Sequence, residues 1–191
     1  VLCINLTQTP STTCGFTDYQ TKNGNPYNVD TSIIVYQNRM YTLPQSTGTL
    51  NRIEAGSNVM YCFDLVTKAA CANQPFQINA LRVTSADIGT NGFSKLEQIG
   101  TSKYAIQKTN KKLFCFNMET NAECSGTWPV APTTVNLETY LSLVAPILGA
   151  NNETTGFCIG LMAGWTCYDM SGAATTVPDN FASLWVSGNN Q

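Results

Sequence analysis

Histidine is absent from this chain of 191 residues. Its absence excludes Ser-His-Asp and Cys-His catalysis and every metal site that needs an imidazole ligand. Charged residues make up only 12% of the sequence and the formal net charge is -2, so no whole-molecule field attracts nucleic acid. The longest apolar run, residues 140–150, is interrupted by Pro146 and falls short of the roughly 20 residues of a spanning helix. We expect no nucleic-acid partner and no membrane insertion.

The sequence also lacks the common motifs of nucleotide, calcium and zinc sites. It has no P-loop, no glycine-rich dinucleotide fingerprint and no Asp-rich calcium loop. Its cysteines never take the CxxC spacing typical of zinc sites. The twelve acidic residues are scattered, so no facing carboxylate pair of the glycosidase type is evident. We therefore expect no cofactor and no metal, name no catalytic residue, and predict that the chain is not an enzyme.

Eight cysteines are present, and they form four close pairs: Cys3/Cys14, Cys62/Cys71, Cys115/Cys124 and Cys158/Cys167. The paired segments read CINLTQTPSTTC, CFDLVTKAAC, CFNMETNAEC and CIGLMAGWTC. Four similar segments in one short chain indicate an internal repeat. Apolar residues flank each first cysteine, and a turn-forming residue follows two positions later: Asn5, Asp64, Asn117 and Gly160. This pattern predicts four β-hairpins.

Each hairpin is expected to carry one disulfide that joins its own two cysteines. Residues opposite each other at a non-hydrogen-bonded position of an antiparallel pair lie about 4.5 Å apart, which is within disulfide reach. Closing a loop of about ten residues stabilises a hairpin by roughly 2–3 kcal/mol. All eight cysteines are then paired, and no free thiol nucleophile is expected.

Two further strands precede the second and third hairpins. Residues 32–48 predict two strands around a turn at residues 37–39, and residues 93–112 predict two strands with turns at residues 100–102 and 109–111. Each unit then reads strand, strand, stapled strand, strand, which is the length and order of a four-stranded antiparallel propeller blade. The predicted fold is one all-β repeat domain, residues 1–191, with approximate units 1–30 (partial), 31–80, 81–132, 133–178 and 179–191 (partial).

The second hairpin, Tyr61-Cys62-Phe63-Asp64 with Thr67 and Cys71, resembles the propeller-type repeats of secreted proteins in which a blade ends YCFDxxTxxxC. The third hairpin, from Phe114 to Cys124, is the next closest match. The first departs through its longer loop and the fourth through Gly160 and Trp165. The resemblance implies a β-propeller-like fold, either a closed ring or a partial propeller, and it carries no catalytic residues.

Heavy pairing of cysteines is typical of oxidising compartments, so we expect a secreted, extracellular or cell-surface glycoprotein. Two sequons, at Asn5 and Asn152, agree with this location. Asn152 is the preferred glycosylation site because it lies in a polar loop, and Asn5 is expected in a hairpin turn. The chain begins with Val and has no signal peptide, which predicts a processed product or a piece of a longer chain.

Four aromatic residues are candidates for stacking on sugar rings: Phe76, Trp128, Trp165 and Trp185. Phe76 and Trp128 follow a staple at what looks like the same place, and packing in the core is favoured for them over glycan binding. Near the end of the chain, an assembly strand is expected over residues 181–187, with Ala182, Leu184, Trp185 and Val186. It is predicted to pair beside residues 1–6 of the same chain or against a neighbouring chain.

The leading functional hypothesis is a non-enzymatic structural or adhesive repeat segment of an extracellular, filament-like assembly. Its expected partners are other copies or segments of the same protein. The alternative is a lectin-like, glycan-binding propeller, and a propeller glycosidase or lyase comes last. Repetition, stapling and a surface rich in Thr and Asn favour the first hypothesis.

Overall fold

The structure, a computed structural model, describes residues 2–5, 7, 9, 12–16, 33–42, 59–78, 95–108, 112–132, 143–161 and 164–178. The regular elements in these ranges are antiparallel β-strands, as the repeat predicted. They are β1 (Leu2–Asn5), β2 (Thr12–Phe16), β3 (Ile33–Tyr36), β4 (Arg39–Thr42), β5 (Val59–Asp64), β6 (Ala69–Ala70), β7 (Phe76–Gln77), β8 (Lys95–Gln98), β9 (Tyr104–Lys108), β10 (Leu113–Asn117), β11 (Ala122–Glu123), β12 (Leu143–Leu148), β13 (Thr154–Leu161), β14 (Gly164–Asp169) and β15 (Ala174–Thr175).

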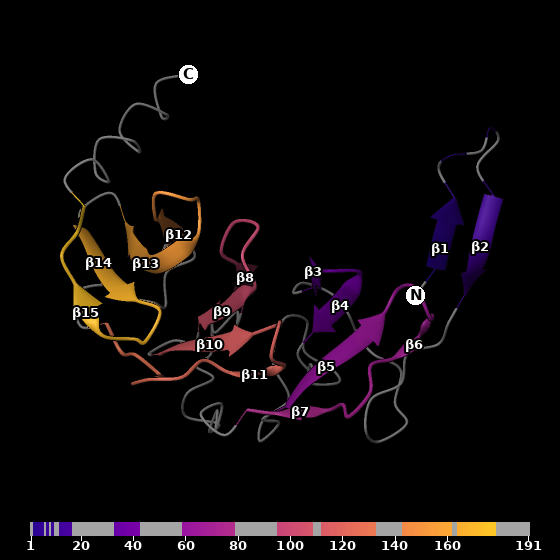
Figure 1. Cartoon of the computed structure of the whole chain (residues 1–191), viewed down its shortest axis with the longest axis horizontal. Helices are drawn as coiled ribbons and strands as arrows, with labels where there is room; N and C mark the ends of the chain where they lie inside the picture. The colour runs from indigo at the N-terminus through magenta and orange to yellow at the C-terminus, as the bar shows by residue number, and fades with distance from the viewer. Residues whose placement is uncertain are drawn as a thin grey trace.

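The strands form three larger sheets and one hairpin, arranged along the chain (Figure 1). The first sheet has the order β3-β4-β5-β6, with β7 pairing β5. The second has the order β11-β10-β9-β8, and the third β12-β13-β14-β15. The hairpin β1-β2 is a sheet of its own. Among the described residues the sheets do not close on themselves, so the closed ring of a propeller is not confirmed.

Three of the four predicted disulfides are present, each within its own hairpin: Cys62–Cys71, Cys115–Cys124 and Cys158–Cys167. The side chains of Cys3 and Cys14 lie outside the described part. In the first two staples the Cα atoms are 5.3 and 5.4 Å apart, and the amide of Cys71 donates a hydrogen bond to the carbonyl of Cys62, as Cys124 does to Cys115. The predicted non-hydrogen-bonded geometry is therefore wrong for these two.

The third staple has the geometry that the sequence predicted. Cys158 and Cys167 are direct cross-strand partners 4.0 Å apart between Cα atoms, the spacing typical of a non-hydrogen-bonded pair. The order of strands differs, however. The first cysteine lies on the third strand in the first two sheets and on the second strand, β13, in the third sheet. The expected order of strand, strand, stapled strand, strand is thus right for two sheets and wrong for the third.

The predicted turn residues act as caps in the first two sheets only. The carboxylate of Asp64 accepts hydrogen bonds from the amides of Val66 and Thr67, and the side chain of Asn117 does the same one unit later. Gly160 was expected to begin a turn, but it lies inside β13, opposite Trp165. The hairpin ladder there continues to the pair Leu161 and Gly164, so the turn falls later than the repeat predicted.

Two clusters of the hydrophobic core lie between the sheets. The first joins the first and second sheets and contains Ile34, Tyr41, Met60, Cys62, Ile78, Leu96, Ala105, Phe114, Phe116 and Met118. The second joins the second and third sheets and contains Ile99, Ile106, Leu113, Cys115, Val130, Phe157, Ile159 and Tyr168. We call these clusters the first and second interface. The face of each sheet that is turned toward the next sheet along the chain is called its forward face.

Strands β5 and β10 are buried on both faces. Met60 and Cys62 enter the first interface, whereas Tyr61 and Phe63 belong to a separate cluster with Met40 and Val59. In β10 the alternation is the same, because Phe114 and Phe116 enter the first interface while Leu113 and Cys115 enter the second. Strand β10 therefore contributes to both interfaces at once, whereas the second face of β5 packs within its own sheet.

Candidate functional site

In the first interface, Tyr41 of β4 is fully buried, and its hydroxyl reaches across to the second sheet. That oxygen lies 2.9 Å from the carbonyl oxygen of Met118 and 2.8 Å from Oδ1 of Asn121. The ring packs 6.1 Å from the ring of Phe116. Burial raises the pKa of the Tyr41 hydroxyl, which stays a hydrogen-bond donor at neutral pH. A strand of one sheet is thus tied to the β10–β11 turn of the next.

The second interface is made by a stack of three aromatic rings. Phe157 of β13 lies between Trp128, at 5.3 Å between ring centroids, and Tyr168, at 5.6 Å. The indole Nε1 of Trp128 donates a hydrogen bond of 3.1 Å to the carbonyl of Met170. Phe157 is fully buried. The loop after the second staple therefore reaches both the apolar face and the backbone of the third sheet.

Two loops also meet directly at the second interface. The amide and the hydroxyl of Thr127 donate to the carbonyl of Ser171, at 2.7 and 3.1 Å. Gly126, with φ of 119°, sits so close that a Cβ there would come within 2.1 Å of the Ser171 oxygen. Only glycine fits at this position, because any side chain would push the two loops apart.

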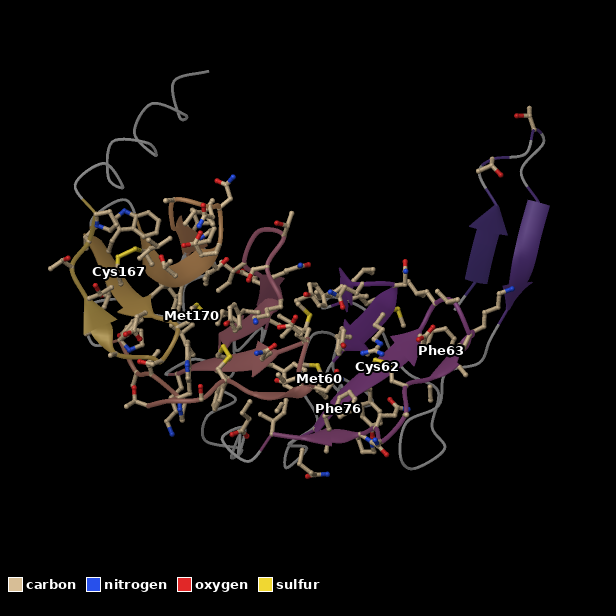
Figure 2. All side chains as sticks on the ribbon, in the orientation of Figure 1. Met60, Cys62, Phe63, Phe76, Cys167 and Met170 are labelled. Carbon is tan, nitrogen blue, oxygen red and sulfur yellow. A yellow bond between two sulfur atoms is a disulfide. The ribbon has the colours of Figure 1, made fainter. Side chains whose placement is uncertain are left out.

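Each of the first two staples lies on the forward face of its sheet. Cys62 is part of the first interface with Cys71 packed against it, and Cys115 and Cys124 hold the same places in the second. Figure 2 shows Met60, Cys62 and Phe76 around β5. The disulfides therefore do more than close hairpins, since their sulfur atoms are part of the apolar surface that the next sheet covers.

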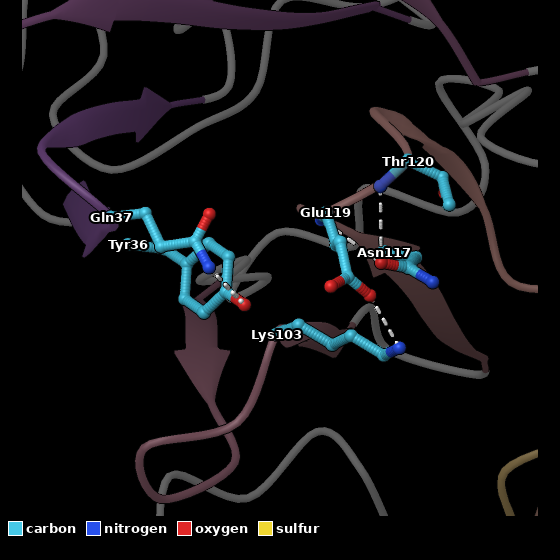
Figure 3. Close-up of polar contacts among 6 residues, drawn as sticks. All are labelled: Tyr36, Gln37, Lys103, Asn117, Glu119 and Thr120. Atoms are coloured by element: carbon cyan, nitrogen blue, oxygen red, sulfur yellow. Dashed lines mark hydrogen bonds and ion pairs between the residues drawn. The ribbon is translucent and has the colours of Figure 1, made fainter.

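A polar cluster lies where turns of the first and second sheets approach each other (Figure 3). The ammonium of Lys103 lies 2.6 Å from a carboxylate oxygen of Glu119 and 5.5 Å from the centroid of the Tyr104 ring. The hydrogen bond to Glu119 raises the pKa of Lys103. Both side chains are substantially exposed, with 34% and 51% of their surface accessible, so this ion pair contributes about 0–1 kcal/mol.

The structure corrects the proposed equivalence of Phe76 and Trp128. Phe76 pairs with Met60 of β5, whereas the residue in the matching place of the second sheet is Val130, which bridges Leu113 of β10. Both Phe76 and Trp128 are partly buried, and each packs against an interface cluster. Whether either binds glycans stays a prediction.

The residue in the first sheet that matches Trp128 is Gln74, since each directly precedes the proline before the bridging residue. The side-chain oxygen of Gln74 accepts a hydrogen bond from the amide of Cys62. This bond is internal to the first sheet, whereas Trp128 reaches the third sheet. Repeat spacing alone missed the match, because the loop after the second staple is one residue longer.

The structure describes some, but not all, of the remaining residues that the sequence singled out. Trp165 lies on β14 and is partly buried. Asn152 is exposed in the β12–β13 turn with φ of 61°. Asn5 ends β1 opposite Thr12, so it lies in a strand and not in the turn that was expected. Trp185 and the assembly strand over residues 181–187 lie outside the described residues.

Asp169 was missed as a structural residue. Its carboxylate accepts bonds from the amide and hydroxyl of Ser171 and from the amide of Ala173, closing the β14–β15 turn. The Ser171 hydroxyl is the main cause that lowers the pKa of this carboxyl. The signal was available in the sequence as Asp-Met-Ser-Gly, an acid followed by small turn residues.

One small cavity of about 10 Å³ lies in the first interface, lined by Met60, Ile78, Leu96, Ala105, Phe114, Cys115 and Phe116. Its lining is apolar. Among the described residues, no group of three or more His, Cys, Asp or Glu side chains gathers in a way that could hold a metal. In the same part of the chain, no helix has the length and hydrophobicity needed to span a membrane.

No protein-family model and no curated protein sequence matches this chain.

Proposed function

We propose that this chain is a non-enzymatic structural or adhesive repeat segment of an extracellular or cell-surface assembly, in which successive sheets act as blades of a propeller-like array. One observation carries the proposal: the same kind of joint occurs twice. In both interfaces the forward face of a stapled sheet is covered by the apolar residues that flank the next stapled cysteine, Phe114 and Phe116 in one and Phe157 and Ile159 in the other.

A joint of this kind supports an architectural role because it makes each sheet depend on its neighbour. The apolar residues of β10 are shared between the two interface clusters. Separating the sheets at either interface would therefore expose the β10 residues of that cluster to water. In arrays of this type, stability is the sum of the units and of their nearest-neighbour contacts. Disulfides that lie at those contacts suit an oxidising location, in agreement with the proposed secretion or display on a cell surface.

A lectin-like function is the second candidate, and the position of Trp165 favours it. A Cβ on Gly160 would come within 2.8 Å of the Trp165 ring, so the indole lies against the glycine backbone. The side chain is partly buried, and its accessible part could contact a sugar ring. A propeller glycosidase or lyase ranks below both.

The experiment that separates these functions measures self-association and sugar binding on the same oxidised protein. Light scattering and negative-stain electron microscopy over a hundredfold concentration range are expected to show particles that grow with concentration. A screen of neutral and acidic oligosaccharides is expected to show no binding. A monomer at every concentration that binds one class of oligosaccharide would replace the structural proposal with the lectin.

A further inference from the structure

The β12–β13 turn carries one of the two sequons of the chain, Asn152-Glu153-Thr154. Its backbone closes the turn: the amide of Gly149 donates to the carbonyl of Glu153 at 2.8 Å, and the amide of Asn152 donates to the carbonyl of Gly149 at 3.1 Å. The carboxylate of Glu153 also accepts a bond of 2.9 Å from the amide of Asn151. None of these bonds needs the side-chain amide of Asn152, which belongs to an exposed residue.

The backbone conformation of Asn152 alone is sufficient reason for an asparagine at this position. Its φ of 61° lies in the left-handed region, which asparagine tolerates better than most residues. Asn38, Asn73 and Asn121 also have positive φ. Of these four residues, only Asn152 is followed two positions later by a threonine or serine. The turn itself therefore accounts for the asparagine, but it does not require Thr154.

An exposed apolar side chain lies directly beside this sequon. Leu148 is the last residue of β12, and it is the cross-strand partner of Thr154. Such partners have Cβ atoms about 4.5–5.5 Å apart. Earlier in the same strand, Val144 packs against the second interface, whereas 53% of Leu148 is exposed. A single exposed leucine is ordinary on a protein surface, so the argument depends on its position next to the acceptor asparagine.

The first sugar of an N-linked glycan has the chemistry to cover this leucine. N-acetylglucosamine presents C–H groups on its ring and a methyl group on its acetyl substituent. These groups can contact the Leu148 side chain and remove part of it from water. The polar hydroxyl groups of the sugar would stay in solvent. A glycan on Asn152 would therefore gain a contact with the protein that a fully solvated glycan lacks.

We propose that Asn152 carries an N-linked glycan and that its first N-acetylglucosamine packs on Leu148. In the transfer, a bond forms between Nδ2 of Asn152 and C1 of the sugar. The bond between C1 and the pyrophosphate oxygen of a lipid-linked oligosaccharide breaks, the amide loses one proton, and the lipid pyrophosphate leaves. The donor belongs to the secretory pathway, so this inference rests on the proposed extracellular location.

The first experiment measures occupancy of the acceptor. The full-length chain is secreted from eukaryotic cells, and peptide mapping after treatment with peptide N-glycosidase detects each glycosylated asparagine as aspartate, with Asn152 and Asn5 on separate peptides. Most Asn152 should be occupied in the wild type and in Thr154→Ser, and none in Thr154→Ala. Thr155→Ala is the matched control, because it changes the next threonine, which is exposed and outside the sequon.

The second experiment measures the contact with Leu148. Protein trimmed by endoglycosidase to a single N-acetylglucosamine should unfold roughly 2 °C above protein from which the glycan is fully removed, the scale expected from covering half of a leucine side chain. In Leu148→Ser this difference should fall to less than half of the wild-type value while Asn152 stays occupied. If circular dichroism shows that Leu148→Ser does not fold, Leu148→Ala replaces it.

The outcomes separate this inference from the proposed structural role. Secreted wild type with a bare Asn152 overturns the inference, and so does a shift in unfolding temperature that is equal in the wild type and in the folded Leu148 variant. Neither result bears on self-association, which is measured independently by light scattering. Failure of the glycan therefore leaves the structural role standing, whereas an occupied Asn152 on a chain that never associates overturns the structural role alone.

Discussion

The first and second interfaces join similar sheets by different chemistry. The first uses a buried hydroxyl: Tyr41 reaches from a strand to the turn of the next sheet, 2.9 Å from the Met118 carbonyl. The second uses flat aromatic stacking on Phe157 and a loop that donates from Trp128 and Thr127 to the third sheet. Both interfaces therefore use the forward face of a stapled sheet. The residues that hydrogen-bond across them come from a strand in the first interface and from a loop in the second.

The exchange between Gln74 and Trp128 shows how one position alters the connection. Gln74 closes its own sheet by accepting the amide of Cys62, whereas Trp128 extends into the neighbouring sheet. A polar side chain here stabilises the unit, and an aromatic one stabilises the joint. The two interfaces should accordingly respond differently to matched substitutions.

The largest effect is expected from removing the central ring of the aromatic stack. Phe157→Ala should destabilise the protein by about 3–5 kcal/mol, the range for a buried phenylalanine, and the loss should fall at the upper end because two rings stack on it. Phe116→Ala is the matched variant in the first interface, where the nearest ring centroids are 6.1 and 6.2 Å away. Its loss should be smaller, as measured by urea denaturation. Equal losses would show that stacking does not distinguish the interfaces.

Removing one staple should be the next largest change. Replacing both cysteines of Cys62–Cys71 by alanine opens a loop of about ten residues and should cost roughly 2–3 kcal/mol. The same double substitution at Cys115–Cys124 should cost as much, since both staples lie in an interface. The shift of the denaturation midpoint, with an unchanged dependence of the unfolding free energy on denaturant concentration, would measure this loss. A loss below about 1 kcal/mol at either site would mean that its disulfide contributes little to closing the hairpin.

Smaller effects should follow from removing the single polar ties. Tyr41→Phe should cost about 1–2 kcal/mol because it takes a hydrogen bond from buried acceptors. Trp128→Phe keeps a ring on Phe157 and loses only the bond to the partly buried Met170 carbonyl, so its cost should be about 1 kcal/mol. Thermal unfolding of both variants tests the order. If Trp128→Phe proved the more damaging, the size of the indole would matter more than its hydrogen bond.

The smallest effect concerns pH. Hydrogen bonds from the amides, that of Thr67 first, lower the pKa of Asp64 below its ordinary 3.8. A carboxyl with a lowered folded-state pKa stabilises the protein above its unfolded pKa, and that stability is lost as the pH falls through the folded value. Asp64→Asn copies the uncharged cap that Asn117 provides in the second sheet. It should narrow the difference in unfolding midpoint between pH 5 and pH 2, and an unchanged difference would assign the acid sensitivity to other groups.

The staples and the strands of the first two sheets could be predicted because cysteine spacing and turn residues are local signals. The pair of turn caps, Asp64 and Asn117, follows from the same logic. The third sheet could not be aligned by spacing, since its hairpin keeps nine-residue separation but runs its ladder through Gly160 to the tip. The capped turn of this sheet joins its third and fourth strands, β14 and β15, and its cap is Asp169, two residues after the second cysteine, Cys167.

The interfaces themselves were not predictable from the pattern of apolar residues. Strands buried on both faces, such as Val59–Asp64 and Leu113–Asn117, show no alternation that would tell which residue meets which neighbour. The role of Trp128 depended on a one-residue difference in loop length. Such information appears only when the cross-strand partners, Phe76 with Met60 and Val130 with Leu113, are known.

The last strands of the three sheets, β6, β11 and β15, are only two residues long. A strand of that length offers very few backbone groups for hydrogen bonds to a strand of another chain. Short edge strands are a common protection against edge-to-edge aggregation. Contact between copies is thereby discouraged at these outer edges and left to the faces. The association of copies that we propose would therefore avoid these three edges.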